Sequence, residues 1–179
     1  MEFAQAEVSN AGLQTGPHKV SQAELRAVPQ MPALAAKLCA DSHANDPASV
    51  VCRICERAFD PASEIVTMTP SVVARLLLED GSAIDVDNRL LIGRSPITDE
   101  PLDTLTVAGR QVSRHHALLE TRGWELYIRD YDSTNGTFLT RRGERGRRRV
   151  PSDESILVRI GDSIHFGSRQ ALVVQPKAD

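Results

Sequence analysis

The turn motif Ser133-Thr134-Asn135-Gly136-Thr137 joins two strand-like stretches, residues 124–130 and 137–140. Two other polar motifs, Gly93-Arg94 and Ser113-Arg114-His115-His116-Ala117, also lie where strand-like stretches end. Glycine tolerates positive φ, and serine, threonine and asparagine bond readily to nearby backbone, so these residue types favour turns. We therefore expect all three motifs to occupy loops at the ends of β-strands.

Short apolar stretches separated by turn residues continue from about residue 72 to residue 174. We expect strands at residues 73–78, 83–86, 89–92, 116–120, 124–130, 137–140, 155–159, 163–166 and 170–174. Trp124, Leu126 and Ile128 alternate along one of them and are expected to form its buried face. Many short strands without a long helical pattern predict an all-β fold, specifically a β-sandwich.

Composition limits the class of protein. The chain has 179 residues, 21 of them basic and 24 acidic, which predicts one ordinary domain with a small additional element. No apolar run approaches the roughly 20 residues that a membrane-spanning helix needs, and the first residues lack the pattern of a secretory signal. Three cysteines are too few, and odd in number, for a disulfide framework. The expected location is therefore the reducing cytoplasm.

Three regions of the chain differ in composition. Residues 1–32 are polar, contain proline and show no sustained periodicity, so we expect a disordered tail or linker. Residues 33–61 contain all three cysteines. Residues 72–175 contain the expected strands and are predicted to form the sandwich domain.

Cysteine and histidine recur in the pattern Cys-x3-His-x8-Cys-x2-Cys, formed by Cys39, His43, Cys52 and Cys55. Three thiolates and one imidazole complete the tetrahedral shell of a closed structural zinc site. Binding Zn²⁺ would let a segment too short for a core of its own fold around the ion. Four protein ligands leave no open position, which argues against a catalytic metal.

Arg94, Ser113 and Asn135 offer the chemistry that recognition of a phosphorylated peptide needs. A phosphorylated side chain carries about −1.5 to −2 charges and requires donors that converge from fixed loops. The planar, always-charged guanidinium of Arg94 suits phosphate oxygens, and Ser113 adds a hydroxyl and a backbone N–H. Asn135 supplies a donor and an acceptor together, the pair that holds an extended peptide backbone.

The three motifs, in this order and followed by Ile160-Gly161-Asp162-Ser163-Ile164, resemble the forkhead-associated (FHA) domain. The resemblance covers about residues 72–174 and implies a β-sandwich that binds phosphothreonine peptides. It implies these phosphopeptide-binding residues: Arg94, Ser113, Arg114, Thr134 and Asn135. It implies that these residues support the site: Gly93, His116 and Gly136.

Two further segments bear on this resemblance. The region from Cys39 to Cys55 resembles small zinc ribbons, including an element associated with FHA proteins of actinobacteria. An arginine-rich insertion, residues 141–149, stands where FHA domains usually have another Asn-Gly turn, and we expect it to be an exposed loop. His115 falls at a variable position of its motif and is expected to be solvated.

The leading hypothesis is a cytoplasmic adaptor without enzyme activity, which binds a threonine-phosphorylated protein downstream of a Ser/Thr kinase. An alternative is nucleic-acid binding through the zinc ribbon and the arginine-rich loop, although the near-neutral charge of the chain argues against it. A third is an enzyme with Ser113 as nucleophile and His116 as base. For that reading no orienting group or oxyanion site is apparent in the sequence.

Overall fold

The structure is a computed structural model that describes residues 32–70 and 72–176. The regular structure in these residues is all β-strand, and none of them forms a helix that could cross a membrane. The tail expected over residues 1–32 lies outside the described residues, except for Pro32. The strands are β1 (Leu34–Leu38), β2 (Ala44–Asn45), β3 (Ile65–Met68), β4 (Ala74–Leu78), β5 (Ala83–Val86), β6 (Arg89–Gly93), β7 (Asp103–Thr106), β8 (Ala117–Arg122), β9 (Glu125–Asp130), β10 (Thr137–Thr140), β11 (Arg148–Arg149), β12 (Ile156–Val158), β13 (Ser163–Phe166) and β14 (Arg169–Val174).

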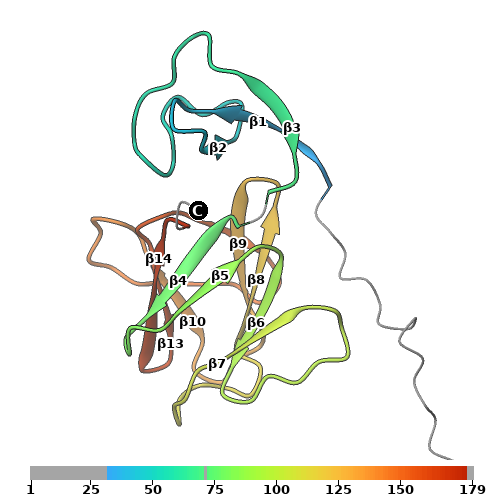
Figure 1. The fold of residues 1–179 in the computed structure, drawn as a ribbon. Coiled ribbons are helices and arrows are strands. Elements are labelled where there is room, and N and C mark those ends of the chain that lie inside the picture. The colour runs from blue at the N-terminus through green and yellow to red at the C-terminus, as the bar shows by residue number, and fades with distance from the viewer. Residues whose placement is uncertain (1–31, 71, 177–179) are drawn as a thin grey trace, which may run out of the picture.

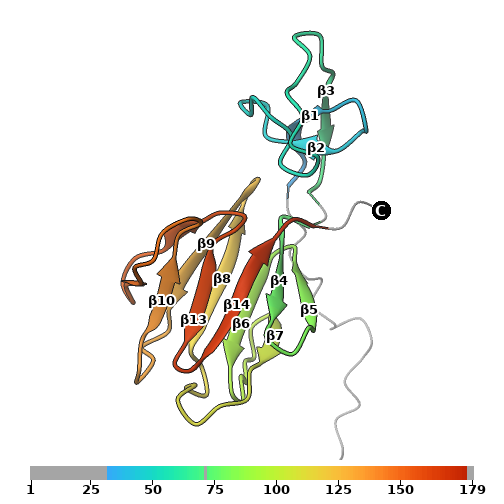
Figure 2. The same ribbon diagram turned by 90° about the vertical axis from the view of Figure 1, so that its left-hand side faces the viewer.

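A six-stranded and a five-stranded sheet pack face to face (Figure 2). Their strand orders are β11-β10-β13-β14-β4-β5 and β12-β9-β8-β6-β7. Strands β6 and β7 pair in parallel, whereas the other neighbours in these two sheets pair antiparallel. The all-β sandwich expected from the sequence is therefore confirmed.

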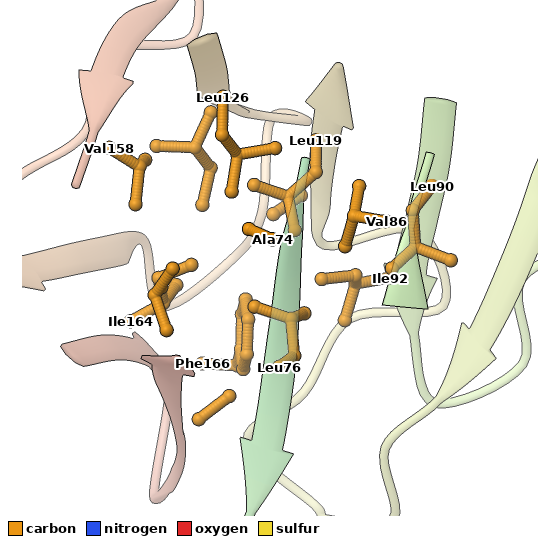
Figure 3. Packing of buried hydrophobic residues seen from close by; sticks show 14 of the residues in the cluster. Ala74, Leu76, Val86, Leu90, Ile92, Leu119, Leu126, Val158, Ile164 and Phe166 are labelled. Carbon is orange, nitrogen blue, oxygen red and sulfur yellow. The ribbon is translucent and has the colours of Figure 1, made fainter. Parts of the chain in front are cut away.

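The hydrophobic core lies between these two sheets (Figure 3). Leu76 of β4 and Phe166 of β13 project from one sheet, and Ile92 of β6 and Leu119 of β8 project from the other. Alternate residues of a strand point to opposite faces. Leu76 is accordingly fully buried, while the next residue, Leu77, is 37% exposed.

A third sheet, with the order β2-β1-β3, lies beyond one end of the sandwich (Figure 1). We call residues 34–68, which contain this sheet and the cysteine-rich segment, the small unit. The sequence analysis ended this unit at residue 61, but its sheet continues to Met68 because β1 pairs with β3 from Leu34↔Met68 to Lys37↔Ile65. The small unit therefore includes the chain that leads directly into the sandwich.

Trp124 does not lie on the buried face of a strand, so this part of the sequence prediction was wrong. Strand β9 begins only at Glu125, and Trp124 lies half-buried in the turn between β8 and β9. Its Nε1–H donates to the carbonyl oxygen of Ala35 in the small unit at 3.1 Å. Leu126 and Ile128 are buried as expected. The alternation stops at Trp124 because the chain reverses direction there.

Strands β7 and β11 were not expected. The four residues of β7, Asp103–Thr106, include a single large apolar side chain, and β7 pairs only along one edge, with β6. Strand β11 has two exposed arginines and pairs only with β10. Edge strands of this kind bury little apolar surface, so the sequence carries little periodic signal for them.

Replacing Leu76 with alanine should lower the free energy of unfolding by about 2–5 kcal/mol, because a fully buried leucine leaves a cavity. Its neighbour Leu77 is a matched control on the opposite face of β4. Leu77→Ala should change the free energy of unfolding by about 0.5 kcal/mol, as is usual for surface substitutions. Denaturant titration of both variants measures the difference. Similar losses for the two would contradict the packing of β4.

Candidate functional site

Three loops meet at the end of the sandwich that lies away from the small unit (Figure 1). They join β6 to β7, β7 to β8 and β9 to β10. The Arg94 N–H donates to the Ser113 carbonyl oxygen at 2.9 Å, and the Thr134 N–H donates to Ser113 Oγ at 3.0 Å. The Asn135 side-chain amide donates to the Gln111 carbonyl oxygen at 2.9 Å. These hydrogen bonds bring Arg94, Ser113, Thr134 and Asn135 together.

Gly93 allows the first two loops to approach each other. A Cβ on Gly93 would lie 1.8 Å from the carbonyl oxygen of Arg114 and 3.1 Å from that of Ser113. Any residue with a side chain would therefore push the end of β6 away from the loop before β8. The close approach leaves the side chains of Arg94 and Arg114 exposed at the same end of the sandwich.

His116 links the β7–β8 loop to the β9–β10 loop from the protein interior. Its Nδ1 accepts the Ser113 N–H at 2.9 Å, so its Nε2 carries the proton that faces the Gly136 carbonyl oxygen at 3.3 Å. The ring is fully buried and packs edge-on against Phe166, with the ring centroids 5.8 Å apart. Burial lowers the pKa of His116, although the Gly136 carbonyl and the Asp130 carboxylate oppose this shift. His116 therefore links the backbone of the Ser113 loop to that of Gly136 from a buried position.

Asp130 shapes the loop between β9 and β10. Its buried carboxylate accepts hydrogen bonds from the backbone and hydroxyl of Ser133, at 2.9 and 2.6 Å. It also accepts from the backbone and hydroxyl of Thr137, at 2.9 and 2.5 Å. The residues between these anchors, Thr134 and Asn135, are exposed, and Gly136 has a φ of 77°. Asp130 was not among the predicted site residues, although carboxylates commonly anchor turns as this one does.

Gln111 and His115 also have roles that the sequence did not indicate. Gln111 acts through its backbone carbonyl oxygen, which accepts the hydrogen bond from the Asn135 side-chain amide. Every residue has such a carbonyl, so the sequence does not mark this role. A Cβ on Gly167 would lie 2.6 Å from that same carbonyl oxygen, so the turn between β13 and β14 supports the Gln111 loop. His115 is half-buried, not solvated as expected: its Nε2 accepts the Ile97 N–H at 3.2 Å, and its ring contacts Tyr131 edge-on at 6.0 Å between centroids.

The four cysteine and histidine residues singled out in the sequence lie together in the small unit: Cys39, His43, Cys52 and Cys55. Their ligand atoms all lie within 4.8 Å of one another. Cys39 Sγ is 3.4 Å from His43 Nδ1 and 3.9 Å from Cys55 Sγ. Bonds of about 2.0–2.3 Å in a tetrahedral zinc shell place neighbouring ligand atoms about 3.5–3.8 Å apart. The donor set and its spacing therefore fit a single metal ion.

Asn45 organises this cluster from a buried position. Its side-chain N–H donates to Cys52 Sγ at 3.4 Å, and its Oδ1 accepts the Arg53 N–H at 2.7 Å. Burial raises the pKa of the Cys52 thiol, but the backbone N–H groups of Cys55 and Ile54 and the Asn45 side chain outweigh burial and lower the pKa to about 6. These donors favour the thiolate, which is the form that binds metal.

Replacing Gly93 with alanine should lower the free energy of unfolding by about 1–3 kcal/mol, because the added methyl group overlaps the Arg114 carbonyl. Gly146 is the matched control, since a Cβ there meets nothing within 4 Å. Gly146→Ala should leave stability unchanged within about 0.5 kcal/mol. Thermal unfolding and the amide NMR shifts of Arg94 and Ser113 provide the measurements. Unchanged shifts and stability in Gly93→Ala would contradict the close approach.

Comparison with known proteins identifies the sandwich. Residues 90–167 match the family model of the FHA domain. The FHA domain-containing protein FhaB of Mycolicibacterium smegmatis is 35% identical over 94 residues, which cover 51% of this chain and 59% of FhaB. The glycogen accumulation regulator GarA of the same organism is 30% identical over 116 residues, covering 64% of this chain and 60% of GarA.

The match therefore spans about 60% of the length of each of these two relatives. Among solved structures, the FHA domain of an Arabidopsis thaliana protein is similar at 20% identity and a TM-score of 0.49, covering 64% of this chain and 97% of that one. The family match runs from β6 to β13. Because these residues carry all three loop motifs, this part of the chain is an FHA domain.

Proposed function

We propose that the FHA domain binds peptides phosphorylated on threonine, and that the protein is a non-enzymatic adaptor for a threonine-phosphorylated partner downstream of a Ser/Thr kinase. The observation that carries this proposal is the meeting of three loops, which brings Arg94, Ser113 and Asn135 to one end of the sandwich. The match to the FHA family model supports the same function.

The hydrogen bonds leave the right groups available for a phosphate and for the backbone beside it. Ser113 Oγ accepts from the Thr134 N–H, and its contact with Thr134 Oγ1 is long at 3.5 Å, so its proton is available to a phosphate oxygen. Arg94 and Arg114 supply exposed guanidinium groups for the dianion. One amide hydrogen of Asn135 bonds to Gln111, which leaves its Oδ1 to accept a peptide N–H.

The geometry of Ser113 and His116 argues against the enzyme hypothesis. A general base must bond to the hydroxyl that it activates. His116 Nδ1 instead accepts the backbone N–H of Ser113, and its Nε2 faces the Gly136 carbonyl oxygen. Neither ring nitrogen is free to take the Ser113 hydroxyl proton. The pair therefore holds two loops together and does not form a nucleophile with its base.

The nucleic-acid hypothesis also finds little support. Binding to nucleic acid needs several cationic side chains that are free to neutralise phosphates. In the arginine-rich insertion, Arg141 pairs with Asp162 at 2.6 Å and Arg148 pairs with Glu144 at 3.0 Å, while the other four arginines form no ion pair among the described residues. In the small unit, Arg57 pairs with Asp41 at 3.0 Å. The chain as a whole carries a formal net charge of −3.

Replacing Arg94 with alanine should weaken binding of a phosphothreonine peptide about 10- to 150-fold, because a hydrogen bond to a charged group contributes about 1.5–3 kcal/mol. Arg122→Ala is the control, since Arg122 is an exposed arginine near the opposite end of β8. Calorimetric titration of both variants with phosphothreonine, phosphoserine and unmodified peptides tests the proposal. Equal binding of the three peptides by the unaltered protein would refute it.

We propose further that Cys39, His43, Cys52 and Cys55 hold one structural Zn²⁺ as a zinc ribbon. The compact set of three thiols and one imidazole supports this assignment. Four protein ligands fill a tetrahedral shell, so the ion would stabilise the fold and would not act as a Lewis acid on a substrate. Thiolate ligands persist under reducing conditions, so we also propose that the protein is cytoplasmic.

Arg53 connects this ligand cluster to the FHA domain. It lies between the ligands Cys52 and Cys55, and its guanidinium donates to the carbonyl oxygens of Val73 and Val72 at 2.6 and 3.2 Å. The same guanidinium lies over the Trp124 ring, 5.2 Å from the ring centroid. A metal ion that orders this loop would therefore also hold Arg53 against the sandwich. We infer that the ion braces the small unit on the FHA domain.

Removal of the metal should therefore increase the exposure of Trp124. This is the only tryptophan of the chain, so its fluorescence reports on the contact between the two units. A chelator should shift the emission maximum to longer wavelength, and added Zn²⁺ should reverse the shift. Cys55→Ser should show the shifted spectrum without chelator, whereas Arg94→Ala should not. A metal content near zero, or an unchanged spectrum after metal removal, would contradict the proposal.

A further inference from the structure

We propose that the site selects phosphothreonine peptides with acidic side chains beside the phosphothreonine, and that Arg149 is the residue that reads them. This inference rests on the proposed phosphothreonine function and adds a specificity that the FHA motifs do not contain. Its source is the arginine-rich insertion, residues 141–149, predicted from the sequence as an exposed loop and, in the alternative hypothesis, as a contact for nucleic acid.

The end of the insertion is fixed to the loop that presents Thr134 and Asn135. Strand β11 pairs with β10 at Phe138↔Arg149. The Val150 N–H donates to the Thr137 carbonyl oxygen at 2.9 Å, and the Asp130 N–H donates to the Pro151 carbonyl oxygen at 2.9 Å. Val150 itself is 1% exposed and belongs to the core. The backbone on both sides of Arg149 is therefore anchored along this loop.

The side chain of Arg149 lies against Gly136. Its Nε and Cζ are 3.2 and 3.3 Å from the position that a Cβ on Gly136 would occupy. Gly136 directly follows Asn135, the residue proposed to hold the peptide backbone. The guanidinium of Arg149 thus lies near Asn135, while Arg94 belongs to the β6–β7 loop. A peptide held by Asn135 would bring a neighbouring side chain to Arg149.

Arg149 is one of the arginines of the described residues that form no ion pair. Seven ion pairs occupy arginines elsewhere: Arg57–Asp41, Arg75–Asp85, Arg89–Glu100, Arg122–Glu120, Arg141–Asp162, Arg148–Glu144 and Arg169–Glu79. In residues 32–70 and 72–176, Arg149, the site arginines Arg94 and Arg114 and several other arginines have no carboxylate within 4.0 Å. Among them, Arg149 is the one placed beside Gly136.

The carboxylates nearest in sequence do not neutralise Arg149. Asp130 is buried and accepts four hydrogen bonds from Ser133 and Thr137. Asp132 is exposed on the same loop but forms no ion pair among the described residues. Inside the insertion, Glu144 is taken by Arg148. An exposed guanidinium without a counter-charge attracts a carboxylate from the ligand, and this attraction improves specificity and association rate.

The test compares one phosphothreonine peptide in three versions, with neutral neighbours, with aspartates before the phosphothreonine, and with aspartates after it. One of the two acidic versions should bind about 2- to 5-fold more tightly than the neutral version, as expected for an exposed ion pair. The advantage should shrink as ionic strength rises, because salt screens such pairs. Arg149→Ala should remove the advantage while it binds the neutral peptide as tightly as the unaltered protein does.

Arg145→Ala is the matched control, because Arg145 is an exposed arginine of the same insertion. It should retain the full preference for the acidic peptide. Equal binding of all three phosphopeptides would overturn the inference and leave phosphothreonine binding intact. A loss of affinity for the neutral peptide in Arg149→Ala would make Arg149 a phosphate ligand, which also overturns it. Failure of every phosphopeptide to bind would refute the proposed function itself, and the inference with it.

Discussion

The site depends on one buried carboxylate. Asp130 satisfies two backbone N–H groups and two hydroxyl groups, those of Ser133 in the loop that follows β9 and those of Thr137 at the start of β10. A buried donor left without a partner lowers the free energy of unfolding by about 1–3 kcal/mol, so these hydrogen bonds stabilise this conformation of the loop. The shape directs Thr134 and Asn135 outward and sends the Gly136 carbonyl towards His116. Through His116, the same constraint reaches Ser113 on the neighbouring loop.

Strands β8 and β9 connect the two chemically distinct parts of the molecule. At one end of this hairpin, Trp124 contacts Ala35 and Arg53 of the small unit. At the other end, His116 precedes β8 and Asp130 ends β9. Six residues of extended strand span roughly 20 Å. The cluster of three cysteines and one histidine is therefore too far away to contact a phosphate bound beside Ser113, and a metal ion held there would act on the fold of the small unit and its attachment.

Features that depend on neighbouring residues in the chain could be predicted from the sequence. The polar motifs lie at the boundaries of strands, as expected, because glycine, asparagine and serine break the apolar alternation at those positions. The roles of residues that contact a segment far away in the sequence could not be predicted. Trp124 follows the alternation of β9 but contacts the small unit, and His115 accepts an N–H from Ile97, which is 18 residues earlier in the chain.

By itself, the sequence determined the all-β fold, the polar loops and the group of three cysteines with one histidine. Each of these follows from the spacing of residues that are close together in the chain. Only the tertiary structure decided which loops meet, that Gln111 acts through its carbonyl, and that Arg149 lies against Gly136. It also placed Arg53 between the cysteine–histidine cluster and the sandwich. The physical reason is that these contacts join residues far apart in the chain and depend on sheet register, which local patterns do not encode.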